Sequence, residues 1–132
     1  PLDLIRLNVP HWRKTGWGRV VNVTSSWGSF AEGLEGPGAY GVAKAALNAL
    51  TVALVRDLPK GVKINACDPG WVATRMGGEK APRSVEQGAD TPVWLAMLRG
   101  HFDSVGHQMN GMLSVHHLGQ HQPCWLKWAL DL

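Results

Sequence analysis

Cysteine, tyrosine and phenylalanine are scarce in this 132-residue sequence, which contains two, one and two of them. Two cysteines, Cys67 and Cys124, are too few for a disulfide framework, and their contexts favour a reduced, intracellular protein. No stretch approaches the roughly 18 uninterrupted apolar residues of a membrane span, and no charged-then-apolar leader opens the chain. The sequence therefore predicts a cytoplasmic protein without a membrane partner.

Charged residues are also sparse and scattered. They make up 17% of the chain, the formal net charge is +3, and no run of five or more Lys and Arg occurs, so we expect no nucleic-acid partner. A hydrophobic share of 45% favours a globular protein over a disordered one. Because the first residue is Pro1 rather than Met, we expect a piece of a longer or processed protein.

Two short apolar runs, residues 19–23 and 62–66, have the β-branched residues and flanking turn residues of buried strands. The alanine- and leucine-rich segment between them, residues 39–58, predicts a helix that Pro59 and Gly61 would end. Strand, helix and strand in this order predict a βαβ unit with parallel strands.

Helices are also expected on both sides of this unit. Residues 2–14 read as the end of a helix in which Pro10 weakens the last turn. Residues Ser84 to Gln87 form a capping box that predicts a helix running to about Leu98. Pro92 inside it implies a kink or a later start.

Candidate catalytic residues converge on the edge where the two predicted strands end, the edge where open parallel sheets bind ligands. Ser25 and Ser26 follow the first strand, and residues 68–74 follow the second. Tyr40, the single tyrosine, and Lys44 lie one helical turn apart on one face of the helix that begins there.

This combination suits proton transfer. A phenol has a reference pKa near 10, too high for easy proton exchange at neutral pH, and a nearby ammonium favours its ionised form. A serine hydroxyl could hold a carbonyl or alcohol oxygen against the phenol. We therefore predict that Tyr40 is an acid/base, the alternative being that Tyr40 and Lys44 are surface helix residues and the serines belong to a turn.

Four sequence blocks, in order, carry a resemblance to the short-chain dehydrogenase/reductase family. They are GRVVNVTSSWG (18–28), GAYGVAKAALNAL (38–50), VKINACDPGWVATRMGG (62–78) and SVEQGADTPVWLAML (84–98). The chain resembles the carboxyl-terminal half of that family, and specifically its carbonyl-reductase-like members. The resemblance implies an α/β fold, part of a Rossmann-type doubly wound parallel sheet. It also implies two regions, a catalytic segment over residues 1–98 and a divergent tail of unknown structure over residues 99–132.

The resemblance also implies roles for individual residues. The catalytic serine would be Ser25, with Ser26 as the alternative, and Tyr40 would be the acid/base. Lys44 would bind the nicotinamide ribose and tune the tyrosine. Residues 75–83 would be the mobile substrate-loop region. The cofactor would further lie against a segment of which four residues match the family pattern: Pro69, Gly70, Val72 and Thr74.

The activity implied by the resemblance is reversible hydride transfer between NAD(P)H and a small-molecule carbonyl or alcohol, with NADP slightly favoured over NAD. It also implies a homo-oligomer formed through the helix over residues 39–58. The glycine-rich pyrophosphate-binding turn of the family does not occur in this sequence. The alternative is therefore a non-catalytic fragment or association module, and the sequence leaves open whether this chain is an enzyme by itself.

Two further motifs carry less weight. Residues 36–41 fit G-x-G-x-x-G, but they lack the strand-to-helix turn that would bind a dinucleotide. His116, His117, His121 and Cys124 are spaced loosely like metal ligands, but no second ligand pair accompanies them. We predict no metal site.

Overall fold

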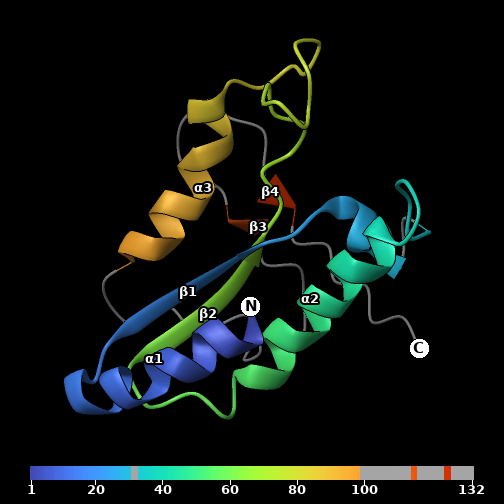
Figure 1. Ribbon diagram of the computed structural model, residues 1–132. Coiled ribbons are helices and arrows are strands. Elements are labelled where there is room, and N and C mark those ends of the chain that lie inside the picture. Colours follow the sequence, from blue (N-terminus) through green and yellow to red (C-terminus); the bar gives the residue numbers. More distant parts are fainter. Residues whose placement is uncertain (31–32, 99–113, 116–123, 126–132) are drawn as a thin grey trace.

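The computed structural model describes residues 1–30 and 33–98, together with two short backbone segments at 114–115 and 124–125. Most of the tail over residues 99–132, including His116, His117 and His121, lies outside the described residues. The elements in chain order are α1 (Leu2–Thr15), β1 (Gly18–Val23), the 3₁₀ turn η1 (Ser26–Gly28), α2 (Tyr40–Leu54), β2 (Val62–Cys67), α3 (Val85–Met97), β3 (Ser114–Val115) and β4 (Cys124–Trp125) (Figure 1).

The central sheet is formed by β1 and β2, which run parallel. Their register extends from Gly18 opposite Val62 to Val23 opposite Cys67. With α2 between them in the chain, they form the expected βαβ unit. The α/β fold class and the parallel arrangement of the two strands are thus confirmed, and both strands end at the same edge. β3 and β4 pair with each other, antiparallel.

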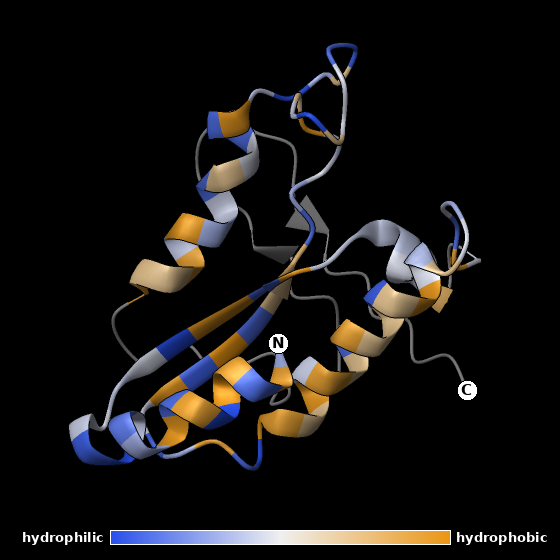
Figure 2. Ribbon diagram, viewed as in Figure 1, coloured by the Kyte–Doolittle hydropathy of each residue, from blue (hydrophilic) through white to orange (hydrophobic). Residues whose placement is uncertain are grey.

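The sheet is covered on both sides. In Figure 1, α1 and α2 lie on one side of the two strands and α3 lies on the other, and both α2 and α3 contact both strands. α2 is hydrophobic over most of its length, whereas α1 mixes hydrophobic and hydrophilic residues (Figure 2). Burial is deepest on β2, where Ile64 is 0% and Cys67 is 1% exposed.

Polar side chains also connect α2 to β1. Asn22 and Thr51 are both buried, and the Asn22 amide donates to the Thr51 hydroxyl at 2.8 Å. The Thr51 hydroxyl in turn donates to the Leu47 carbonyl oxygen at 2.8 Å. Because the buried Asn22 amide and the buried Thr51 hydroxyl are both hydrogen-bonded, this chain of hydrogen bonds fixes the helix on the strand.

Helix boundaries differ from the expectation at one point. The α-helix expected to reach Leu58 ends at Leu54. After it, the Val55 and Asp57 amides donate to carbonyls three residues back rather than four. Pro59 accounts for the early end, because a proline ring clashes with the helical carbonyl four residues back, here Val55, and also disfavours the helical conformation of Leu58.

α3 starts at Val85, so Pro92 does not delay its start. The predicted capping box is present in full: Ser84 accepts from the Gln87 amide, and the Gln87 side chain accepts from the Ser84 amide. α1 likewise contains Pro10 and continues to Thr15. Within the described part of the chain, no helix has both the length and the apolarity needed to cross a bilayer.

Candidate active site

Tyr40 and Lys44 lie at the start of α2, at the edge where β1 and β2 end. Tyr40 is the first residue of the helix and is half-buried. The Lys44 Nζ lies 5.5 Å from the centre of the Tyr40 ring. The same nitrogen donates a hydrogen bond to the carbonyl oxygen of Val23, the last residue of β1, at 3.0 Å. The ammonium is therefore held between the phenol ring and the end of the strand.

Ser25 forms the turn that follows β1. It caps η1, and its hydroxyl accepts a hydrogen bond from the Trp27 amide at 3.3 Å. The Trp27 ring meets the Tyr40 ring edge-on, with centroids 5.9 Å apart and planes at 83°. Such an edge-to-face contact is a favoured arrangement of two aromatic rings. Trp27 thus connects the serine turn to the tyrosine.

The serine turn packs closely on α2. Gly28 is buried, and a Cβ added to it would lie 2.7 Å from the Lys44 backbone and Cβ. The Asn48 side chain donates to the Gly28 carbonyl oxygen at 3.3 Å, and the Thr24 hydroxyl donates to the Lys44 carbonyl oxygen at 3.3 Å. These contacts pack the turn that contains Ser25 against the first turns of α2, which contain Tyr40 and Lys44.

The segment after β2 contributes Pro69 and Gly70. Gly70 has a φ of +74°, in the region that favours glycine. Its amide donates to the Oδ1 of Asp68 at 2.8 Å, while the Oδ2 of Asp68 accepts from the Ser26 amide at 2.8 Å. Asp68 therefore joins the turns that follow the two strands.

Val72 and Thr74 lie farther along the loop that leads to α3. Val72 pairs with Arg83 in a parallel bridge and packs against Gly88 of α3. The Thr74 hydroxyl accepts from the Gly77 amide at 3.1 Å and lies 3.4 Å from the Val72 carbonyl oxygen. The Thr74 hydroxyl therefore bonds to its own loop. The expected mobility of residues 75–83 stays a prediction.

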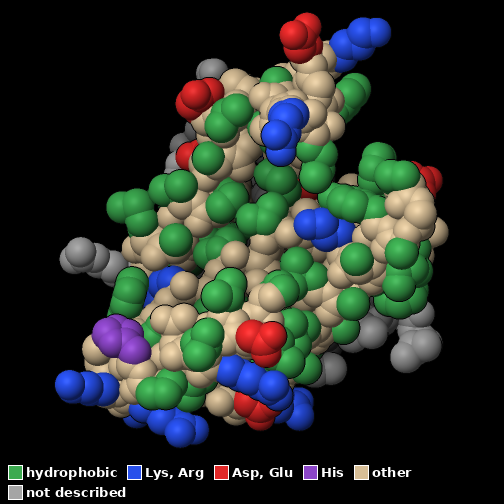
Figure 3. Space-filling view, in the orientation of Figure 1, with side chains coloured by type: hydrophobic (Ala, Val, Ile, Leu, Met, Phe, Trp, Pro, Cys, Tyr) green, Lys and Arg blue, Asp and Glu red, His purple; other side chains and the backbone are tan. Residues whose placement is uncertain are grey.

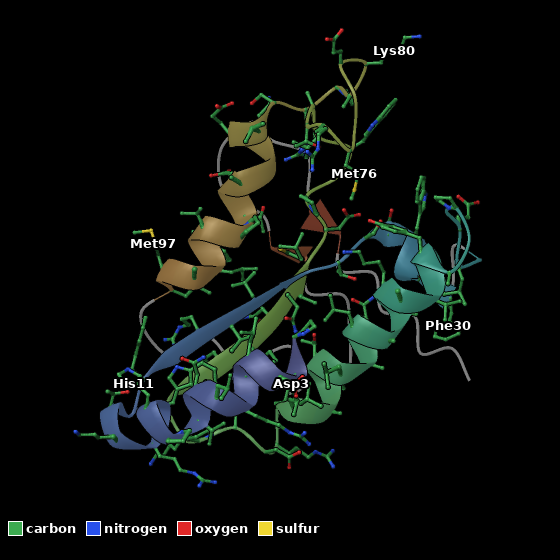
Figure 4. All side chains as sticks on the ribbon, viewed as in Figure 1. Asp3, His11, Phe30, Met76, Lys80 and Met97 are labelled. Carbon is green, nitrogen blue, oxygen red and sulfur yellow. The ribbon has the colours of Figure 1, made fainter. Side chains whose placement is uncertain are left out.

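Apolar side chains on both loops flank this edge of the sheet. Trp27 and Phe30 are 42% and 75% exposed, and Trp71 and Met76 on the opposite loop are 57% and 86% exposed. Phe30 lies beside the start of α2, whereas Met76 and Lys80 extend from the loop between β2 and α3 (Figure 4). Hydrophobic side chains cover much of this face of the molecule (Figure 3). The edge therefore presents apolar surface next to the polar groups of Tyr40 and Lys44.

Sequence reasoning missed several residues that hold the site together. Trp27, Gly28 and Asn48 had no assigned role, and Asp68 was placed at this edge without its contacts, although an Asp directly before Pro-Gly is a known turn signal. The contacts of Gly28 and Asn48 depend on how η1 packs on α2, which no local pattern reveals. Among the described residues, no group of three or more His, Cys, Asp or Glu could hold a metal ion.

Comparison with known proteins identifies the family. The family model described as short chain dehydrogenase matches residues 1–84, more than half of the chain. The chain belongs to the short-chain dehydrogenase family. The predicted resemblance to carbonyl-reductase-like members is confirmed by curated relatives and by a solved structure.

Two curated relatives illustrate the similarity. Carbonyl reductase [NADPH] 1 of Sus scrofa is 53% identical over 64 residues, which cover 45% of this chain and 22% of that protein. Carbonyl reductase [NADPH] 3 of Mus musculus is 48% identical over 65 residues, covering 46% of this chain and 24% of that protein. The match thus spans about a quarter of the length of these relatives.

The solved structure of carbonyl reductase Sniffer of D. melanogaster has a TM-score of 0.51 to this chain at 36% sequence identity. The alignment covers 59% of this chain and 33% of that one. The partial Rossmann-type fold expected from the sequence agrees with this match.

Proposed function

We propose that this chain carries the catalytic segment of an NAD(P)-dependent oxidoreductase that reduces a carbonyl, or oxidises an alcohol, by hydride transfer. The observation that carries the proposal is the position of the Lys44 ammonium, 5.5 Å from the centre of the Tyr40 ring and hydrogen-bonded to the end of β1. This geometry holds a cation next to the phenol ring at the edge where open parallel sheets bind ligands.

In this proposal Tyr40 donates a proton to the carbonyl oxygen of the substrate, and accepts one from an alcohol in the reverse direction. The Ser25 hydroxyl holds the same oxygen against the Tyr40 hydroxyl. The contacts of the Tyr40 ring with Trp27 and Lys44 do not use its hydroxyl. The exposed apolar rings of Trp27 and Trp71 offer surface at this edge that an apolar substrate would cover.

The residues present fit the nicotinamide-ribose half of a cofactor. Lys44 uses one N–H on Val23, and an ammonium has two others that suit ribose hydroxyls. The segment proposed to lie along the nicotinamide contains Pro69, Gly70, Val72 and Thr74. There the Thr74 hydroxyl would give up its long contact to the Val72 carbonyl oxygen and bond to the cofactor instead. When bound, the nicotinamide supplies or accepts the hydride. The names of the curated relatives favour NADPH as the cofactor.

The test is a fluorescence titration of the purified chain with NADPH and with NADH, followed by an assay of NADPH oxidation with an aromatic aldehyde. Saturable binding that Lys44→Ala weakens, together with turnover, supports the proposal. A folded chain that binds neither dinucleotide contradicts it. Lys60→Ala, on an exposed turn remote from α2's first residues in sequence, is the matched control.

A second candidate is a non-catalytic association module, and one observation favours it. α2 presents an exposed face of small and apolar residues, on which Val42 is 58% and Val52 is 40% exposed. The exposed alanines of the helix are Ala43, Ala46, Ala49 and Ala53. Small side chains allow two helices to approach closely, so α2 would form the interface of a homo-oligomer. In this candidate residues 1–98 associate, and residues 99–132 are a separate tail.

A further inference from the structure

Asp68 lies at the point where the two strands separate. The last residue pair of the sheet is Val23 with Cys67, and one further backbone bond follows, from the Thr24 amide to the Cys67 carbonyl oxygen at 2.8 Å. Beyond this bond, the segment after β1 turns into η1, which packs on α2. The segment after β2 runs toward α3. The backbones diverge, as they do at the ligand-binding edge of an open sheet.

The carboxylate of Asp68 connects the two segments after their backbones have separated. Its Oδ2 accepts from the Ser26 amide and its Oδ1 accepts from the Gly70 amide, each at 2.8 Å. Hydrogen bonds to an ionised carboxylate are about twice as strong as bonds between neutral groups. The bond to Gly70 is local and shapes its own turn, but the bond to Ser26 reaches across 42 residues of sequence. A role confined to the turn does not require the second bond.

We propose that Asp68 is a positioning residue that sets the separation between the Ser25 turn and the Pro69–Gly70 turn. The proposal rests on the proposed function, in which Ser25 holds the substrate oxygen and Pro69–Gly70 lie along the nicotinamide. Both groups must keep their spacing for the hydride to meet the carbonyl carbon. A displacement of about 1 Å between reacting groups can lower a rate by about 100-fold.

The first test does not depend on activity. In ¹⁵N-labelled protein, acidification should shift the Ser26 and Gly70 amide protons along one common titration curve, since both are bonded to the same carboxylate. Asp68→Asn should abolish both shifts, whereas Asp57→Asn, in the exposed turn after α2, should leave them unchanged. In folded protein, a Ser26 amide that does not follow Gly70, or that titrates alike in Asp68→Asn, overturns the proposal.

The second test separates positioning from stability. With NADPH and an aromatic aldehyde, Asp68→Ala should lower kcat by about 10- to 100-fold, with a smaller change in KM. Asp68→Asn keeps one carboxamide oxygen as an acceptor and should retain more activity than Asp68→Ala. An unchanged kcat for the folded fraction of Asp68→Ala would overturn the proposal. Wild-type protein without turnover contradicts the proposed function instead, and the amide titration then decides on Asp68 alone.

Discussion

The Lys44 ammonium and the Tyr40 ring lie one turn apart on α2, with 5.5 Å between the nitrogen and the ring centre. The ammonium is fixed from a second side by its hydrogen bond to the Val23 carbonyl oxygen. A flexible lysine stem is thereby held by two elements of the fold, the helix and the strand. Such fixed placement of a charge is what an acid/base site requires before substrate arrives.

Tyr40→Phe removes the phenol hydroxyl and keeps the ring that contacts Trp27 and Lys44. Loss of a general acid/base should lower kcat by about 100- to 10,000-fold, while NADPH affinity changes little. Steady-state NADPH oxidation and a separate NADPH titration measure the two effects. Wild-type kcat in Tyr40→Phe would exclude Tyr40 as the proton donor.

Gly28→Ala should separate the serine turn from α2. The added Cβ would lie 2.7 Å from the Lys44 backbone, too close for any rearrangement short of a backbone shift. Overpacking of this kind lowers the free energy of unfolding by about 1–3 kcal/mol. Urea unfolding of Gly28→Ala and of its neighbour Ser29→Ala measures the difference, and equal loss in both variants would contradict the packing described.

Thr51→Val should destabilise the protein because it leaves the buried Asn22 amide without its acceptor. Thr51 is 1% exposed, and its hydroxyl accepts from the Asn22 amide. An unsatisfied buried donor lowers stability by about 1–3 kcal/mol. Thr15→Val is a matched control, because Thr15 is also a helical threonine bonded to the carbonyl four residues back but is exposed. Similar midpoints for the two variants in urea unfolding would contradict this prediction.

Glu86 should make the start of α3 sensitive to acid. Its pKa lies below the reference value of 4.5, because its carboxylate accepts from its own backbone amide and from the Ser84 hydroxyl. The stabilisation by charged Glu86 is therefore complete above about pH 4.5 and is lost as the pH falls through the lowered pKa. An NMR titration of the Glu86 carboxyl measures this. Ser84→Ala should move the midpoint up toward the reference value, and an unchanged midpoint would contradict the assigned cause.

Ala46→Glu tests whether α2 forms the proposed homo-oligomer. Ala46 lies on the exposed face of the helix with Val42 and Ala49, so a glutamate there would place an unpaired charge in a helix–helix interface. We expect the dissociation constant of the oligomer to rise at least about tenfold. Sedimentation over a range of concentrations measures it, with Lys60→Glu as the control on an exposed turn. Identical sedimentation of wild type and Ala46→Glu would exclude this interface.

Local signals predicted the frame of the fold. The β-branched runs gave both strands to within a residue at each end, and Ser84 with Gln87 marked the start of α3 because a capping box is a local device. The end of α2 was placed four residues too late. Alanine and leucine favour helix up to Leu58, but the Pro59 ring clashes with a helical carbonyl at Val55, four residues earlier.

The candidate site was predicted only as far as spacing and edge geometry reach. Tyr40 and Lys44 lie together, as an i, i+4 pair on one helix must. The contacts of Asn48 with Gly28 and of Asp68 with Ser26 join residues 20 and 42 positions apart, and they depend on tertiary packing. The assigned roles of Ser25, Tyr40, Lys44, Pro69, Gly70, Val72 and Thr74 stay predictions.

The edge-on contact between Trp27 and Tyr40 gives the site an optical signal of its own. Tyr40 is the single tyrosine of the chain, so an alkaline absorbance titration of the phenol follows one ionisation, without labels or substitutions. With 5.9 Å between the two ring centres, ionised Tyr40 should quench Trp27, and because the chain has seven tryptophans, Trp27→Phe identifies the share of the emission that changes. The proton on this hydroxyl can therefore be observed directly, before any substrate for the protein has been found.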